Sequence, residues 1–429
     1  MSLQDRFRTS GWSSVCINLK NMLSLTMKSN IILLLSVLCG SLSVMGNNAD
    51  SVSVRCPLGV SDATVNAGLR GTYVMPTNHL LRGDNPGGCR VSAGMAPFME
   101  FSVRNAPYTR YGRWYPSAYQ GVGAGLQFTL PDRVVGSSAL LYAFQGATFA
   151  RVSSRLTLDY EWNFGAAMGW KSYDHDASDY NREEDAVGSS ATAYINLGVY
   201  LRYRLSDRLG IFGGAEITHF SNGNTSDPNP GINMLGARLG ISYALGAPSP
   251  LRRADWSDFE PGMVYDIAAY GAWRRWTYNP NTDTSYDGGV MLVPGKFAVA
   301  GLCINPMYRV NPVFSAGAAI DAQYDEGANL SGNYVTTSST EDPKFYRTSF
   351  TDRLSLGVSA RVEFRMSLFA INIGLGRSVY APGGEDLRGW YNTFSLKTFV
   401  TDRIFLLTGY RLYRFNEPGN LMLGCGYRF

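Results

Sequence analysis

Charge, histidine and paired cysteine are all scarce in this chain of 429 residues. Only 17% of the residues are charged and the net charge is +4, without a basic run, so no nucleic-acid partner is expected. None of the six cysteines stands in a Cys-x-x-Cys spacing, which argues against a metal cluster, and no other cofactor is expected. After residue 50, no apolar run reaches the roughly 18 residues that a membrane-spanning helix needs.

Glycine and tyrosine are abundant instead, with 47 and 26 residues. Low charge together with many glycines and aromatics is typical of transmembrane β-barrels. Alternating apolar and polar residues predict sixteen strands. The expected strands cover residues 66–76, 95–105, 119–129, 138–150, 153–170, 189–205, 208–220, 232–245, 259–279, 289–303, 308–324, 348–364, 367–380, 389–400, 403–415 and 420–429.

The connections between these strands are short and long in turn. Tight turns are expected at Arg151-Val152, Ser206-Asp207, Asn305-Pro306, Arg365-Met366 and Thr401-Asp402. Longer polar loops are expected at 171–188, 221–231, 280–288 and 325–347. This asymmetry is typical of outer-membrane barrels, whose long loops face the outside of the cell.

Both ends of the chain also indicate export to the outer membrane. Residues 28–46 have a cationic start, a short apolar stretch and small residues, so residues 1–46 are expected to be a signal peptide with an upstream extension; translation could begin at Met1 or Met27. The last strand alternates apolar residues up to a terminal Phe429, as the assembly signal of outer-membrane barrel proteins does. In the oxidising space beyond the inner membrane, Cys56 and Cys89 could form a disulfide or stay free.

One short stretch places polar residues on the apolar side of two strands. His219 and Ser221 are two residues apart, so on a strand they point to the same side as Ile217. Asn233 has the parity of Leu235 on the next strand. If the apolar side faces lipid, a His, a Ser and an Asn meet at the edge of a bilayer.

These residue types are suited to ester hydrolysis. A serine hydroxyl needs a base within about 3 Å to become a nucleophile, and histidine exchanges protons near neutral pH. The oxyanion of the reaction needs fixed donors, which Asn222 or a backbone amide at Gly223 could supply. The chain has only three histidines, His79, His175 and His219.

The stretch His219-Phe220-Ser221-Asn222-Gly223, followed by Pro228-Asn229-Pro230-Gly231-Ile232-Asn233, resembles the signature of the outer-membrane lipid A 3-O-deacylases, the acyloxyacyl hydrolase family. The resemblance covers roughly residues 60–246. It implies an eight-stranded barrel whose serine esterase site faces the outer leaflet, with lipid A of lipopolysaccharide as substrate. It also implies His219 as general base, Ser221 as nucleophile and Asn222 as an oxyanion donor.

The chain departs from the family at Asn233, where the resemblance implies a glutamate. An asparagine lacks the negative charge that stabilises an imidazolium. Its side-chain oxygen can still accept a hydrogen bond and hold the tautomer of His219, as in Cys-His-Asn proteases. We therefore expect Asn233 to take part in a slower but active site.

We interpret the second half of the chain as a repeat of the first half that lacks this motif. Asp207 to Phe220 parallels Asp402 to Phe415, and the Met-Leu-Gly at 234–236 recurs at 422–424. In this register the counterparts of His219, Ser221 and Asn233 are Arg414, Asn416 and Leu421.

The repeat gives three parts after the signal peptide: a deacylase-like eight-strand unit at 60–246, a periplasmic connection at 247–258 and a second eight-strand unit at 259–429. We favour one all-β, antiparallel barrel of about sixteen strands, because a continuous sheet avoids a second closure; two tandem barrels of eight strands are the alternative.

Two other functions remain open at this point. A porin-like or structural barrel would need a wide polar lumen, which Arg202, Arg204, Glu216 and Arg238 could line. A degenerate homologue would bind lipopolysaccharide without cleaving it. The sequence does not favour an oligomeric state.

Overall fold

The computed structural model of the chain describes residues 59–429, apart from 86, 173–185, 227–228, 247–248, 251, 276, 279–290, 294, 331–333, 336–343, 346, 385 and 416. The expected signal peptide at 1–46 and Cys56 lie outside the described residues, and Cys89 is a free thiol. No helix in the described part of the chain is long and apolar enough to cross a membrane.

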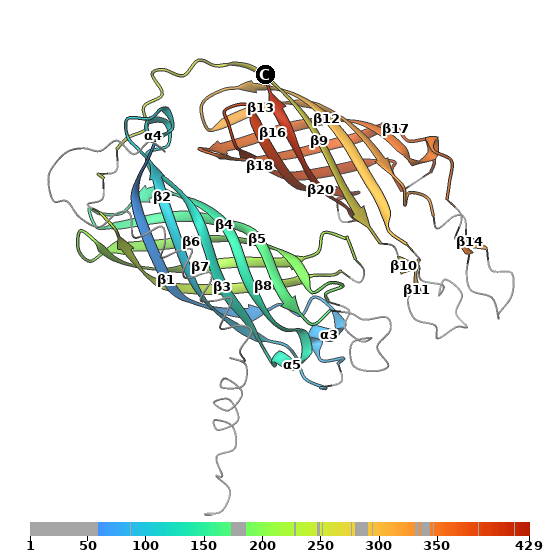
Figure 1. Ribbon diagram of the computed structural model, residues 1–429, viewed down its shortest axis with the longest axis horizontal. Coiled ribbons are helices and arrows are strands. Elements are labelled where there is room, and N and C mark those ends of the chain that lie inside the picture. Colours follow the sequence, from blue (N-terminus) through green and yellow to red (C-terminus); the bar gives the residue numbers. More distant parts are fainter. Residues whose placement is uncertain are drawn as a thin grey trace, which may run out of the picture. The chain divides into compact units, whose positions relative to one another are not determined.

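Eight antiparallel strands form the first closed barrel, in chain order, and β8 pairs back onto β1 (Figure 1). The strands are β1 (Val60–Val74), β2 (Ala93–Asn105), β3 (Ala118–Leu130), β4 (Gly136–Arg151), β5 (Leu156–Trp170), β6 (Ala191–Arg204), β7 (Leu209–Ser221) and β8 (Ile232–Ala244). Three short helices lie in its connections: α3 (His79–Arg82), α4 (Arg110–Trp114) and α5 (Asp132–Val135).

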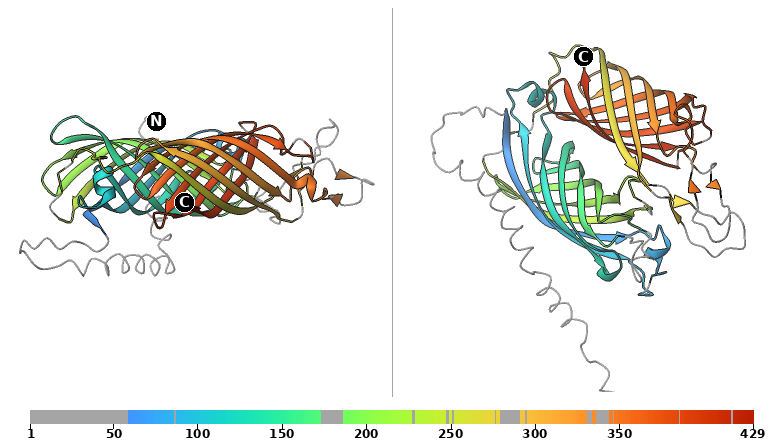
Figure 2. Two further views of the ribbon diagram at one scale, coloured as in Figure 1. Left: turned by 90° about the horizontal axis from the view of Figure 1, so that it is seen from above. Right: turned by 45° about the vertical axis from the view of Figure 1, so that its right-hand side comes forward.

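A second set of eight antiparallel strands forms another closed barrel, in which β20 pairs with β9. These strands are β9 (Gly262–Arg274), β12 (Phe297–Arg309), β13 (Phe314–Asp325), β16 (Leu354–Met366), β17 (Phe369–Tyr380), β18 (Trp390–Phe399), β19 (Ile404–Tyr413) and β20 (Glu417–Arg428). The connections contain the two-residue strands β10 (Thr277–Tyr278), β11 (Met291–Leu292), β14 (Tyr334–Val335) and β15 (Lys344–Phe345), and the 3-10 helix η3 (Thr351–Arg353). The strands of each barrel are visibly tilted in the views of Figure 2.

The favoured single barrel of about sixteen strands is wrong, and the alternative of two eight-stranded barrels is confirmed. The ladder between β1 and β8 runs from Thr64–Ala244 to Val74–Met234 and closes the first unit. Each unit thereby pairs its own edge strands, which would otherwise expose unpaired backbone groups. Eight strands enclose an interior that side chains can fill, so two closures need no open lumen.

Two expected turns are also misplaced. Arg365 and Met366 are the last residues of β16, and the turn follows at 367–368. Asn305 and Pro306 lie inside β12 and pair with Asp266 and Tyr265 of β9, whereas the turn comes later, at 310–313. Proline cannot donate to a ladder, and Pro306 lies at a position where the pairing to β13 skips two residues. A proline therefore marked a local gap in one ladder rather than the end of the strand.

The first barrel has a polar inside and an apolar outside. Apolar side chains on its outer wall are exposed, for example Leu239 at 70% and Ile217 at 53%. The side chains of Arg70, Glu100 and Arg238 are instead almost completely buried in its interior. This is the reverse of a water-soluble sandwich and matches a barrel whose wall faces lipid.

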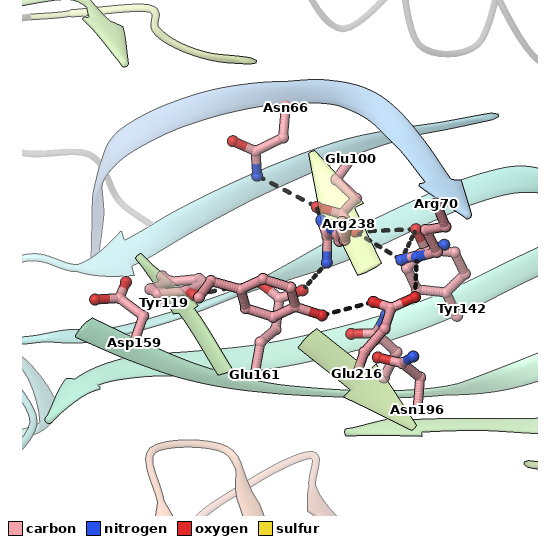
Figure 3. A network of polar contacts seen from close by, with 12 residues as sticks. Asn66, Arg70, Glu100, Tyr119, Tyr142, Asp159, Glu161, Asn196, Glu216 and Arg238 are labelled. Atoms are coloured by element: carbon pink, nitrogen blue, oxygen red, sulfur yellow. Dashed lines mark hydrogen bonds and ion pairs between the residues drawn. The ribbon is translucent and has the colours of Figure 1, made fainter. Parts of the chain in front are cut away.

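The interior of the first barrel is filled by a charged network (Figure 3). Arg238 pairs with both Glu100 and Glu161, and Arg70 Nε lies 3.2 Å from Glu216 Oε1. Tyr200 donates to Glu216 over 2.7 Å. These charged groups are buried and mutually paired, so each is compensated inside the barrel.

The connections of the first barrel differ at its two ends. One end, called the short-turn end here, has the turns 152–155 and 205–208; the other, called the loop end, has the connections 75–92, 171–190 and 222–231. Two connections are exceptions to the expected asymmetry: 106–117, which contains α4, is long and lies at the short-turn end, and 131–135, which contains α5, is short and lies at the loop end. Both termini of this barrel lie at the short-turn end.

Candidate active site

His219, Ser221 and Asn233 lie on the outer wall at the loop end of the first barrel, and in the described part of the chain His219 forms a hydrogen bond with Asn233 but not with Ser221. β7 ends at Ser221 and β8 begins at Ile232, and the ladder between them sets His219 directly opposite Asn233. Ile217 and Leu235 lie next along the same face and are 53% and 48% exposed. The alternation of the two strands thus places all three polar groups at the top of an apolar surface.

The imidazole of His219 is held by Asn233. His219 Nδ1 and Asn233 Oδ1 are 2.7 Å apart. Because a carbonyl oxygen only accepts, Nδ1 is the protonated nitrogen of the neutral ring and Nε2 keeps its lone pair. The contact therefore sets the tautomer that a general base needs, with the basic nitrogen on the far side of the ring from Asn233.

The opposite face of β7 anchors this geometry. Phe220, between His219 and Ser221, is fully buried and packs against Trp170 and Tyr194, with ring centroids 5.1 and 5.4 Å away. Ile232 is likewise fully buried at the start of β8. Packing on the inside therefore fixes the strand positions from which the polar residues project outward.

Asn222 organises the loop between β7 and β8. It is 6% exposed, its backbone N–H donates to Asn229 Oδ1 over 2.9 Å, and its side-chain Nδ2 donates to the carbonyl of Ser226 over 2.6 Å. Asn222 has the parity of the buried Phe220, not that of Ser221. Asn222 thus stabilises the loop through these two hydrogen bonds, and its expected role as an oxyanion donor stays a prediction.

Gly223 provides the backbone donor nearest to the serine. Its N–H donates to Ser221 Oγ over 3.3 Å. Its φ of +65° lies in the left-handed region, which glycine adopts without steric cost. The turn therefore aims a backbone amide at the oxygen that would attack an ester.

Gly231 is a site residue to which the sequence gave no role. Its φ is +74°, and a Cβ built on it would lie 2.7 Å from the Phe220 carbonyl oxygen and 3.0 Å from His219 Cε1. Only glycine lets the loop backbone pass so close to the imidazole. The Pro-x-Pro-Gly run was visible in the sequence, but the approach to His219 depends on the ladder register.

The loop end is closed on the inside by apolar side chains. Buried members of this cluster come from three connections and two strand ends: Leu80, Leu81, Val91, Val134, Val135, Val187, Phe220 and Ile232. Together with the charged network, they fill the interior that a porin would leave open. Glu216 and Arg238, expected as possible pore-lining residues, are network members instead.

The other histidines are not part of this site. His79 is exposed in α3 and contacts Asp84, and His175 lies outside the described residues. Among the described residues, no group of three or more His, Cys, Asp or Glu side chains is placed to hold a metal ion.

The corresponding hairpin of the second barrel differs more than the repeat register indicated. Leu421, expected to replace Asn233, lies opposite Tyr410 in the interior of the ladder, so that assignment is wrong. The pairing continues outward to Tyr413 and Glu417, because the turn there is shorter, and turn length sets hairpin register. Arg414 lies beyond β19 with a φ of +47° and forms an ion pair with Glu417; position 416 is not described.

These observations define a class of protein: a tandem β-barrel with an apolar outer wall and a candidate serine hydrolase site at the end of one hairpin. Family comparisons find a match for each of the two barrels. Residues 101–242 match the model of the lipid A 3-O-deacylases (PagL), and residues 263–429 match that of the acyloxyacyl hydrolase C-terminal domain. The two matches together span more than two thirds of the chain, which belongs to the lipid A 3-O-deacylase family, a family of outer-membrane hydrolases.

Solved structures add little to this assignment. A triple mutant of the Rhodopseudomonas blastica porin is 12% identical, with 86% of this chain and 100% of that chain covered and a TM-score of 0.16. A mutant ferric enterobactin receptor from Pseudomonas aeruginosa is 11% identical, with 82% and 44% covered and a TM-score of 0.21. No curated protein matches the chain.

Proposed function

We propose that the chain is an outer-membrane serine esterase that removes an ester-linked acyl chain from lipid A. One observation carries the proposal: the outward-facing His219–Asn233 hydrogen bond beside Ser221, on an apolar wall. A purely structural barrel has no need for this arrangement, since an apolar residue at each position would serve a lipid-facing wall at least as well.

The reaction follows from the two nitrogens of His219. Nε2 accepts the proton of Ser221 as Oγ attacks the ester carbonyl, and a bond forms between Oγ and the acyl carbon. The backbone N–H of Gly223 donates to the oxyanion of the tetrahedral intermediate. His219 then gives its proton to the departing sugar alkoxide, and a water activated by the same nitrogen hydrolyses the acyl-serine.

Asn233 acts on His219 rather than on the substrate. Its side-chain oxygen keeps the proton on Nδ1 while the ring is neutral. It provides no negative charge when the ring becomes an imidazolium, so the site gains less stabilisation than a carboxylate would give. A neutral amide is also less costly than a carboxylate beside a lipid surface.

The outer wall accounts for the choice of an acylated substrate. Ile195 is exposed beside His219 on the neighbouring strand, and Ile217 and Leu235 are exposed two residues further along the same face from His219 and Asn233. In an outer-membrane orientation with the loop end outside, acyl chains lie along this wall and their ester groups reach the level of Ser221. Lipid A is the abundant acylated glycolipid of that leaflet.

The test is mass spectrometry of lipid A from cells that make the wild-type chain, Ser221→Ala or His219→Ala, and from cells without the protein. We expect the wild type alone to produce lipid A lighter by one acyl chain. Ser206→Ala, at the short-turn end, is the matched control and should behave as the wild type. Unchanged acylation in wild-type cells would refute the proposal, and lipopolysaccharide binding without cleavage would identify a degenerate homologue.

A further inference from the structure

A second recess lies at the opposite end of the first barrel. A cavity of about 430 Å³ opens at the short-turn end, inside the mouth of the barrel. Its walls come from the first residues of β1, β3, β5 and β7 and from the last residues of β2, β4, β6 and β8. This volume is within the range of small-molecule binding sites.

Basic side chains dominate the lining. Six arginines take part: Arg104, Arg151, Arg155, Arg202, Arg204 and Arg208. Only three acidic residues accompany them: Asp62, Asp159 and Asp207. The excess of positive charge is concentrated in one concave space, where low-dielectric walls strengthen its field.

The inner arginines and the rim arginines differ in their partners. Arg202, at the floor, is compensated by Asp159 and Glu161, each with a contact of 3.1 Å. Arg204 is two residues further along β6, nearer to the mouth of the barrel. It donates to the backbone carbonyl of Ser154 over 3.0 Å. Neutral contacts of this kind position a guanidinium without cancelling its charge.

The strand positions of Arg202 and Arg204 show that these side chains point into the barrel and not outward towards lipid headgroups. Arg202 and Arg204 alternate with Leu201 and Tyr203, which are exposed on the outer wall. Arg202 and Arg204 therefore share the side of the fully buried Tyr200, and they point into the mouth of the barrel. Arginines that anchor a barrel to headgroups would lie on the other side.

The segment that leaves the barrel completes the cavity. Ser249 N and Oγ both donate to Asp62 Oδ1 over 2.9 Å. These two bonds occupy a carboxylate oxygen that would otherwise face the cavity. Hydroxyls of Ser154, Thr157 and Ser242 also line the space and can donate to an oxyanion.

We propose that this cavity is a binding site for a multivalent phosphate-class oxyanion, held by Arg155, Arg204 and Arg208. Guanidinium groups match the geometry of phosphate oxygens and can bind them in a bidentate manner. The ligand could be a free phosphoanion or the headgroup of an anionic phospholipid, which share this chemistry. The inference is independent of the esterase site, which lies at the loop end.

The second barrel offers a matched control. Arg403 follows Asp402 as Arg208 follows Asp207 in the repeat. It is not among the residues that line the cavity, and it donates to Tyr427 over 3.1 Å. Replacing Arg403 removes the same charge from the chain without altering the proposed site.

The test is calorimetric titration of the detergent-purified full chain with inorganic pyrophosphate. We expect saturable binding that weakens about tenfold or more in Arg204→Gln/Arg208→Gln, since two charge-assisted contacts are lost, and that is unchanged in Arg403→Gln. Arg155→Gln, in an exposed turn, should weaken binding by a smaller factor and serves as a second variant if the double variant fails to fold. Absence of binding, or equal weakening in Arg403→Gln, would overturn the proposal.

The source of the ligand is distinguished by repeating the titration in nanodiscs. If phosphatidylglycerol discs suppress pyrophosphate binding and phosphatidylcholine discs do not, the site takes a lipid headgroup. If both kinds of disc leave binding intact, it takes a free anion. Equal affinity of the wild type and the double variant in phosphatidylcholine discs would refute the site.

Discussion

The two barrels differ most informatively at one pair of corresponding hairpins. β7 and β8 are separated by residues 222–231, whereas β19 and β20 are separated only by 414–416. In the first barrel the ladder reaches His219 and Asn233, and the loop beyond them folds back over the imidazole through Gly231. In the second barrel the ladder ends at Tyr413 and Glu417, and a short turn joins the two strands directly.

This difference separates what the barrel needs from what the site needs. Both barrels have eight strands and a charged interior; in the second, Lys397 and Arg428 pair with Asp266 and Glu363. A tight turn is sufficient to close such a hairpin. The long loop of the first barrel is therefore an addition to the fold, and we attribute it to the reaction.

The largest effect on the deacylation rate is expected from removing the long loop of residues 222–231. Replacing residues 222–231 with residues 414–416 should leave the strands intact but remove the Gly223 amide and the loop around Ser221. Loss of a fixed oxyanion donor costs about 10²–10³-fold in rate, and loss of the loop adds to it. Deacylation of purified lipid A gives the rate, and the shift on heating in gel electrophoresis shows folding. A folded variant with normal rates would contradict the role of the loop.

The next effect comes from the partner of the imidazole. Asn233→Leu removes the acceptor of Nδ1 and frees the ring, and misplacement of a catalytic group costs about 10²-fold. Asn233→Glu keeps an acceptor and adds the charge that stabilises an imidazolium, so its rate should exceed that of the wild type. Leu235→Ala, on the same face, is the control and should retain the wild-type rate. Equal rates for Asn233→Leu and the wild type would show that Asn233 does not orient His219.

A smaller effect is expected at Gly231. In Gly231→Ala, the left-handed conformation costs about 1–2 kcal/mol and the new methyl group presses on Phe220 and His219. We expect about a tenfold lower rate. Gly71→Ala is the matched control, because a Cβ at Gly71 would meet no atom within 4 Å. Similar rates in both variants would mean that the close approach of the loop has no bearing on catalysis.

The smallest effect is expected in the second barrel. Arg414→Ala removes an exposed ion pair with Glu417, which contributes about 0.2–1 kcal/mol at most. Deacylation should be unchanged, and unfolding in urea should shift only slightly. A large loss of activity would show that the second hairpin takes part in the reaction after all.

Periodicity predicted most of the fold because a barrel wall repeats a simple rule. Alternation located all sixteen barrel strands and put His219 and Ser221 on the same face as Ile217. It did not determine whether β8 pairs with β1 or with β9, because both edges have the same pattern. Closure depends on how the interior is filled, which involves residues from all strands at once.

The sequence predicted where the candidate site residues lie on their strands, but not the details of their surroundings. The parity of Asn222 is that of Phe220, and this alone indicates that its side chain does not share the face of Ser221. Gly231 is close to His219 because its loop folds back onto β7. A local sequence pattern does not predict this return. The position predicted for Leu421 in its hairpin was wrong, because a sequence repeat does not show at which residue the turn of a hairpin begins.

The central claim is that Ser221 is a nucleophile activated by His219. Incubating the purified chain with a fluorophosphonate probe and analysing its peptides by mass spectrometry tests this directly, because the probe forms a stable bond only with an activated serine. The account predicts labelling of Ser221 in the wild type and its loss in His219→Ala. An unlabelled Ser221, or equal labelling in both chains, would contradict it.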